Sequence, residues 1–232
     1  MLFSKKNFEE STRAYSLAIG LSANYPEAYY KRGLANLQLG KATDAIADFS
    51  RTIQYNPQFY LAQKGIGDAY FALKDYKNCA TSLEACLAMS SLREAHSPRT
   101  ITEIYNTIGK AYYGMKNYVK ALENYRKFLA FHPNEIPSSF SYEMGNIYMN
   151  MDKYDSAHSY LIRSYQNDPS NGYILYGMAS CIYLRGNTEE SLKWFERSFK
   201  TNALERSFVD HDALLGSLQN DKRFRDLKKK YL

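Results

Sequence analysis

The sequence predicts an all-α fold: a right-handed superhelical solenoid of antiparallel helix pairs with capping helices at its C-terminal end. Two observations support this fold class. Small residues recur about every 34 residues, within segments whose apolar positions follow a helical period. Prolines or other turn residues recur in the same register and mark where each pair of segments ends. Repetition at this interval is typical of solenoids, in which each unit stacks on its neighbours.

The repeat consists of four series of residues that drift together along the chain. The first series is glycine, ending in alanine: Gly33, Gly67, Gly109, Gly145 and Ala179. The second is small residues: Ser11, Ala45, Cys79, Ala121, Ala157 and Ser191. The third is aromatic or leucine: Tyr15, Phe49, Leu83, Tyr125, Leu161 and Phe195. The fourth marks turns: Pro57, Ser91, Pro133, Pro169 and Ala203.

The glycine series predicts close helix crossings. A glycine inside a helix costs about 1 kcal/mol relative to alanine, so its recurrence indicates that bulk is forbidden there. A second helix is expected to cross at each glycine, and the aromatic side chains are expected to fill the remaining space. This accounts for 22 Tyr and 12 Phe beside a single Trp. Each helix of about 13 residues is marginal alone, so stability must come from stacking.

These segments resemble the tetratricopeptide repeat (TPR) family, whose pattern W-x2-L-G-x2-Y, A-x3-F and P has a period of 34 residues. The pattern is recognisable as YKRGLAN, DAIADF and NP in 26–59, QKGIGDAY and DYKNCATSL in 60–91, YNTIGKAYY, NYVKALENY and HP in 102–135, YEMGNIY, KYDSAHSYL and DP in 138–171, and LYGMASCIY and SLKWF in 172–203. Tyr, Gln, Ser or Leu replaces the family's first Trp. The resemblance covers about 1–203 and implies five and a half repeats with a concave groove, lined by first helices, where peptides or partner segments bind.

Two irregularities interrupt the array. Residues 1–25 match only the second helix of a repeat, which predicts an uncovered apolar face. Upstream repeats or self-association would cover that face; alternatively, Leu2 and Phe3 form a short turn over it. Eight extra residues near 91–100 are expected to lengthen one helix until Pro98 ends it.

The segment 204–232 is predicted to cap the array with one or two short amphipathic helices, because a solenoid needs a polar outer face at its end. Asp221 is expected to cap the last helix. Its apolar stripe consists of Phe224, Leu227 and Tyr231. The cations at its C-terminal end, where the helix dipole favours positive charge, are Lys228, Lys229 and Lys230.

Composition excludes several classes of protein. With 45% hydrophobic and 23% charged residues the chain resembles a globular protein rather than a disordered one. The sequence has no run of 18 apolar residues, so no membrane span is predicted, and no signal peptide is visible. Cys79 and Cys86 are seven residues apart, too far for a disulfide on one helix, so reduced thiols and a cytoplasmic location are expected, or periplasmic if a signal was removed.

No catalytic, metal or cofactor site is predicted. The four histidines, His96, His132, His158 and His211, have no metal-ligand spacing, and surface positions are expected for them. The cysteines occupy small-residue positions, which favours core packing over nucleophilic catalysis. The motifs of nucleotide-binding loops and hydrolases are missing from the sequence. We therefore expect a protein that is not an enzyme.

Projection of the TPR groove onto this sequence gives a candidate peptide-binding surface. It is rich in tyrosine, which offers a large contact area at low entropic cost. Its members are Tyr30, Lys31, Leu34, Lys64, Asp68, Phe71, Asn106, Lys110, Tyr113, Tyr142, Asn146, Met149, Tyr173, Tyr176 and Tyr183. Each tyrosine could instead pack between adjacent helices. Alanine at Tyr142 and Tyr176 is expected to weaken binding with little change in melting temperature.

The resemblance suggests a protein-interaction scaffold that holds a peptide or partner segment in its groove. The alternative is a structural spacer or oligomerisation module of a larger multi-repeat protein. Some TPR proteins bind acidic chaperone tails through a carboxylate clamp, but the clamp positions here read Lys64, Asp68, Thr107, Ser139 and Glu143, or Tyr30, Leu34, Gly65, Glu103 and Thr107. We expect no such binding. Nucleic-acid binding is not expected either, since a net charge of +6 is a mild bias.

Overall fold

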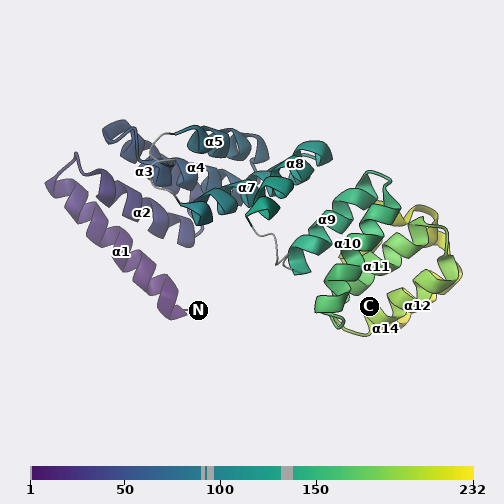
Figure 1. The fold of residues 1–232 in the computed structure, drawn as a ribbon. Helices are drawn as coiled ribbons and strands as arrows, with labels where there is room; N and C mark the ends of the chain where they lie inside the picture. The colour runs from purple at the N-terminus through teal and green to yellow at the C-terminus, as the bar shows by residue number, and fades with distance from the viewer. Residues whose placement is uncertain (1, 90–91, 93–96, 132–137) are drawn as a thin grey trace. The chain divides into compact units, whose positions relative to one another are not determined.

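The computed structural model describes residues 2–89, 92, 97–131 and 138–232. Every regular element in these ranges is a helix (Figure 1), which confirms the predicted all-α solenoid of paired helices. The chain forms two compact units, Met1–Phe131 and His132–Leu232, and each unit is described by itself. The predicted turn residues Ser91 and Pro133 and the histidines at 96 and 132 lie outside the described residues.

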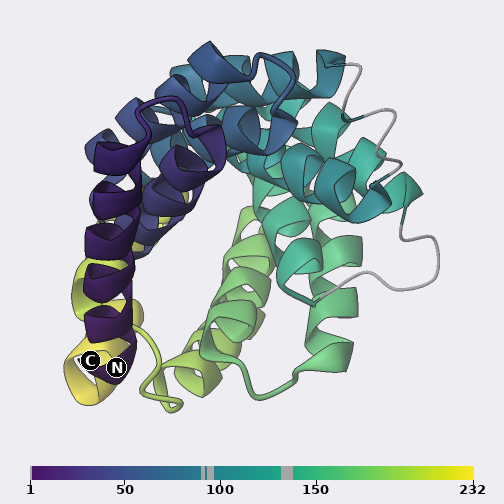
Figure 2. The same cartoon turned by 90° about the vertical axis from the view of Figure 1, so that its left-hand side faces the viewer.

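The first unit contains three helix pairs preceded by one long helix. Its helices are α1 (Leu2–Leu21), α2 (Pro26–Gln38), α3 (Ala42–Tyr55), α4 (Tyr60–Ala72), α5 (Tyr76–Ala88), α7 (Pro98–Gly114) and α8 (Tyr118–Ala130). Within this unit, α1 packs on α2, and each later pair stacks on the one before it, as α3 does on α4 and α5 on α7. Figure 2 shows this stacking in the purple-to-teal part of the chain.

The second unit contains two helix pairs and a C-terminal segment of shorter elements. Its helices are α9 (Ser138–Asn150), α10 (Tyr154–Asn167), α11 (Gly172–Leu184), α12 (Thr188–Phe199), α13 (Arg206–Asp210), the 3-10 helix η1 (Ala213–Asn220) and α14 (Lys222–Tyr231). Within this unit the C-terminal segment, 204–232, shares a hydrophobic core with α11 and α12.

The glycine series meets the aromatic and leucine series. A Cβ at Gly33 would lie 2.7 Å from the ring of Phe49, and one at Gly67 would lie 2.5 Å from Leu83. Gly109 faces Tyr125 in the same way. This confirms that bulk is forbidden at these positions.

Phe49 also links two repeats. A Cβ at Gly65, on the first helix of the next repeat, would lie 2.7 Å from the same ring that Gly33 faces. The ring is fully buried between α2 and α4. One side chain therefore fixes both the pairing of helices within a repeat and the stacking of one repeat on the next.

Each first helix ends with a residue in the left-handed region. These residues are Gly40, Lys74, Lys116, Asp152 and Gly186, with φ between 57° and 90°. The amide after each of them donates to a carbonyl five residues earlier, as Lys41 does to Asn36 at 2.8 Å. This is the Schellman arrangement, which satisfies the last carbonyls of a helix and starts a tight turn.

Pro98 begins α7 and does not end an extended α5, which already stops at Ala88. Residues 90, 91 and 93–96 between these helices lie outside the described residues. Proline is favoured in the first helical turn, where its missing N–H has no helical partner. The Ser97 hydroxyl accepts from the amide of Thr100 at 3.4 Å and caps the helix.

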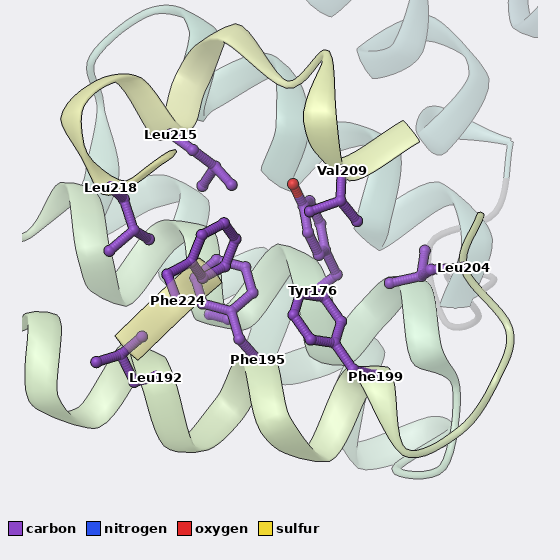
Figure 3. Close-up of a cluster of buried hydrophobic side chains, with 10 residues drawn as sticks. Tyr176, Leu192, Phe195, Phe199, Leu204, Val209, Leu215, Leu218 and Phe224 are labelled. Atoms are coloured by element: carbon purple, nitrogen blue, oxygen red, sulfur yellow. The ribbon is translucent and has the colours of Figure 1, made fainter. Parts of the chain in front are cut away.

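The C-terminal segment closes unit 2 over an aromatic core. Figure 3 shows Phe195 and Phe199 of α12 meeting Phe224 of α14, with Phe195 and Phe224 ring centroids 4.9 Å apart. As predicted, the carboxylate of Asp221 caps α14 by accepting from the amide of Arg223 at 2.8 Å. Of the three lysines at the end of α14, Lys228 is buried, and its ammonium donates to Asp210 at 2.6 Å and to Gln219 at 2.8 Å.

The close crossing at Gly109 generates a prediction. Gly109→Val should lower the stability of unit 1 by about 1–3 kcal/mol, because the added carbons overlap the fully buried ring of Tyr125. The measurement is urea unfolding followed by far-ultraviolet circular dichroism. Gly20→Ala is the control, since nothing lies within 4 Å of a Cβ there and it should slightly stabilise the helix. Equal midpoints for both variants would contradict the interpretation.

Candidate interaction surfaces

A hollow of about 230 Å³ lies on unit 1 where its successive first helices meet. The lining comes from α2, α4 and the start of α7 and includes four of the predicted groove residues: Tyr30, Leu34, Lys64 and Asp68. Leu37, Leu61, Gly65, Thr100 and Glu103 complete it. These positions are far apart in sequence, and the stacking of first helices brings them together. We call this the unit 1 groove.

The charges of the unit 1 groove form one network centred on Lys64. Its ammonium lies 2.8 Å from a carboxylate oxygen of Asp68 and 3.5 Å from one of Glu103. Burial lowers the pKa of Lys64, but the two carboxylates more than offset this and hold it above its usual value. Burial raises the pKa of Asp68, and Lys64 opposes that shift. The groove therefore presents a set of mixed charges beside apolar walls, in which Lys64 and Asp68 are half-buried and Glu103 is exposed.

Tyr30 lines the unit 1 groove and also packs against aromatic side chains of the core. Its ring centroid lies 4.9 Å from that of Phe59 and 5.9 Å from that of Phe49. Burial raises the pKa of its phenol. The adjacent Lys31 is exposed, with its ammonium 5.9 Å from the Tyr30 ring.

The remaining predicted residues of unit 1 lie further along α4 and α7. Phe71 is half-buried and contacts Tyr76, with centroids 5.8 Å apart. Asn106 and Lys110 are half-buried on α7. Tyr113 is exposed near the end of the same helix. None of these four residues lines the 230 Å³ hollow.

The structure moves two predicted groove residues of unit 2 into the core. Met149 and Tyr176 are each only 2% exposed, so neither offers a contact surface. Tyr176 donates from its hydroxyl to Asp212 at 2.7 Å and packs edge-on against Phe195. Tyr176 is buried because the C-terminal segment folds over α11, which the sequence pattern of the repeat did not show. Met149 is buried because it packs against residues of α10 and α11, among them Leu161 and Met178.

Other predicted residues of unit 2 also meet the C-terminal segment. Tyr183 shares a hydrogen bond with Ser217 at 2.9 Å. The Tyr173 ring contacts Phe208 edge-on at 5.7 Å and is 41% exposed. On α9, Tyr142 and Asn146 are half-buried, and burial raises the pKa of the Tyr142 phenol.

The described residues contain no cluster of three histidine, cysteine or acidic side chains that could hold a metal ion. All three cysteines are buried, and burial raises the pKa of Cys79 to about 12 and the pKa values of Cys86 and Cys181 to about 11. Such thiols are protonated and poor nucleophiles at neutral pH. No helix in the described part of the chain is both long and apolar enough to cross a membrane.

A larger pocket of about 700 Å³ lies in unit 2, and its lining residues come from α10, α11 and α12. It is lined by Ile162, Met178, Ile182 and Trp194, with Tyr165 and several polar side chains around it. We call it the Trp194 pocket. No signal in the sequence pointed to this pocket, because the groove positions projected from the repeat lie on another face of α11 and most other lining residues come from second helices. His158, predicted to be on the surface, is half-buried in this pocket; burial and then Arg185 lower its pKa.

The chain belongs to the tetratricopeptide repeat family. Models described as TPR repeat or tetratricopeptide repeat match residues 1–40, 30–84, 107–135 and 142–201. Members of this family are generally non-enzymatic scaffolds for protein–protein interaction.

Several known proteins are similar to this chain. The BBSome complex member BBS4 of Bos taurus is 22% identical over 221 residues, which is 94% of this chain and 40% of that protein. A protein SGT1 homolog of Oryza sativa subsp. japonica is 30% identical over 89 residues, 38% of this chain and 24% of that protein. The chain thus spans less than half the length of these relatives.

Solved structures share the fold at low identity. The C-terminal part of a TPR repeat-containing protein from Cytophaga hutchinsonii has a TM-score of 0.69 at 16% identity, covering 99% of this chain and 91% of that one. YrrB, described as a TPR protein with an unusual peptide-binding site, has a TM-score of 0.66 at 16% identity, covering 90% of this chain and 99% of that one.

The burial of Tyr176 reverses one expectation about its substitution. Tyr176→Ala should destabilise unit 2 by about 3–5 kcal/mol, because it empties an aromatic site in the core. Tyr176→Phe should cost about 1 kcal/mol, since it loses only the hydrogen bond to Asp212. Urea unfolding followed by the fluorescence of Trp194, the single tryptophan, reports on unit 2. An unchanged midpoint for Tyr176→Ala would contradict this assignment, and the more exposed Tyr173→Ala is the control.

Proposed function

We propose that this protein is a non-catalytic scaffold that binds a peptide or an extended segment of a partner protein in the unit 1 groove. The observation that carries this proposal is the hollow built by three successive first helices, with apolar walls and mixed charges. Pockets that combine an apolar surface with a few fixed polar groups are typical of binding sites.

The arrangement of Lys64 argues against acidic chaperone tails as the partner. Its ammonium already contacts Asp68 and Glu103, so an incoming carboxylate would have to displace one of them and approach the other. Like charges placed side by side are destabilising. One relative, the Hsp70-Hsp90 organizing protein of Triticum aestivum, is 29% identical over 92 residues. We nonetheless expect this chain not to bind such tails, which a titration with an acidic chaperone peptide would test.

A photo-crosslinking experiment tests the unit 1 groove. A benzophenone amino acid at Leu34, inside the groove, should capture a partner from cells, whereas the same amino acid at the exposed Arg51 of α3 should not. Leu34→Asn should then weaken binding of the captured partner by about tenfold or more, through loss of an apolar contact. Ile53→Asn is a matched control, since both side chains are partly buried against the same core cluster. Equal capture at both sites, or equal loss in both variants, would count against groove binding.

A second candidate function, self-association or spacing through α1, has its own observation. Among the side chains described on α1, none is fully buried, and Leu17 and Leu21 are 72% and 91% exposed. Leu2 and Phe3 belong to the helix and do not form a separate covering turn. An uncovered apolar helix face of this kind is a candidate interface.

Light scattering coupled to size-exclusion chromatography tests self-association. A chain that pairs through α1 should show a mass that rises with concentration, and Leu17→Lys with Leu21→Lys should shift it back to the monomer. Val119→Lys on α8, another exposed apolar position, should have no effect. A concentration-independent monomer would exclude this function.

A further inference from the structure

The Trp194 pocket corresponds to a filled position in unit 1. The helix α2 begins at Pro26 and α11 at Gly172, so equivalent residues of these repeats are 146 positions apart. The four apolar lining residues of the pocket then correspond to four polar residues of unit 1. In that order, Ile162, Met178, Ile182 and Trp194 correspond to Ser16, Arg32, Asn36 and Asp48.

In unit 1 the four polar residues satisfy one another. The Arg32 guanidinium contacts Asp48 at 2.6 Å and donates to the Ser16 hydroxyl at 3.0 Å. The amide of Asn36 donates to the second oxygen of Asp48, also at 3.0 Å. The network joins α1, α2 and α3 and occupies this position from within the chain.

In unit 2 the same position is apolar and open. The residues at 162, 178, 182 and 194 cannot hydrogen-bond across the gap, apart from the indole N–H, and a pocket of about 700 Å³ remains. This volume lies in the range of ligand and anchor pockets in proteins. Apolar surface left in contact with water costs free energy that an apolar occupant would recover.

The wall of the pocket is held in place before anything binds. The indole N–H of Trp194 donates to Glu190 at 3.1 Å, and the Tyr165 ring meets the indole edge-on at 5.1 Å. The Arg197 guanidinium lies 4.4 Å from the indole centroid and donates to the Tyr165 hydroxyl at 2.9 Å. A site whose side chains are already ordered loses less entropy on binding.

The charges around the pocket favour an occupant that carries an acidic group beside its apolar side chain. Three cations contact its lining or belong to it: Arg185, Lys193 and Arg197. Two carboxylates, Glu190 and Asp155, partly balance these cations. Glu190 already accepts from both Trp194 and Lys193. Asp155, 93% exposed, pairs with Arg185 at 3.1 Å and is easily displaced. Burial and then Arg185 lower the pKa of His158, which disfavours the charged form of its imidazole.

We propose that the Trp194 pocket is a second interaction site, which holds a bulky apolar side chain of a partner peptide that carries an acidic residue close to it in sequence. The apolar side chain fills the space between α10 and α12, and the carboxylate contacts Arg185. The side-chain amide of Gln166 in the lining suits a peptide backbone, because an amide both donates and accepts. The amide nitrogen of Asn187 can only donate there, since its oxygen already accepts from the amide of Glu190 at 3.1 Å. This site lies on side chains that the unit 1 groove does not use.

A display library of random peptides of about 12 residues, selected on the full chain, provides the probe. The selected peptides should share one bulky apolar residue with Asp or Glu within a few positions. Synthetic copies should change the emission of Trp194, the single tryptophan, in a saturable way. A selection that yields no peptide, peptides without an acidic residue, or binding with no change in Trp194 emission overturns the proposal.

The equivalent repeat of unit 1 supplies the matched variant. Replacement of the four apolar residues as I162S, M178R, I182N and W194D copies the polar network into unit 2 and should weaken binding of a fluorescein-labelled peptide by about tenfold or more. Arg185→Glu, at an exposed position, should also weaken it several-fold while the circular dichroism melt stays unchanged. If the fourfold variant does not fold, the proposal is tested by peptide binding to Arg185→Glu and by the change in Trp194 emission.

The unit 1 groove provides the discriminating control. Leu34→Asn should leave binding of the selected peptides unchanged, because Leu34 lines a different site. Loss of binding in Leu34→Asn, or full binding in a folded fourfold variant or in Arg185→Glu, overturns the proposal.

Discussion

The close contact between helical glycines and large side chains of the paired helix is the constraint on which this structure depends. At Gly33, Gly67 and Gly109 the facing side chain occupies the volume that a Cβ would need. Each contact lets two helices cross closely enough to bury a large side chain completely. Because Phe49 meets glycines of two successive repeats, the same contact also sets how one repeat stacks on the next.

This constraint leaves other positions free to differ between repeats. At one such position, unit 1 carries a hydrogen-bonded set of Ser16, Arg32, Asn36 and Asp48. Unit 2 carries apolar residues and an open pocket at the same place. Both arrangements are compatible with the backbone, because the glycine contacts that position the helices lie elsewhere. A repeat protein can therefore change a surface locally without disturbing its fold.

The C-terminal segment shows how the array ends when no further repeat follows in the described chain. Phe224 enters the aromatic core that α11 and α12 would otherwise expose, and the buried Lys228 pairs with the Asp210 carboxylate and donates to Gln219. The same segment covers Tyr176, which in the repeat register corresponds to Tyr30 of the unit 1 groove. An identical residue at an equivalent position thus lines a groove in one unit and belongs to the core in the other.

The sequence alone determined the repeat, the helical class, the glycine crossings and the Asp221 cap, because each depends on residues close in sequence or in fixed register. It also predicted that Tyr30, Leu34, Lys64 and Asp68 share a surface, and in the structure these four residues line the same hollow of unit 1. Only the tertiary structure decided that Met149, Tyr176 and Lys228 are buried and that an apolar pocket surrounds Trp194. The physical reason is that burial depends on which segment folds over a helix, and the C-terminal segment has no counterpart in the repeat pattern from which its position could be inferred.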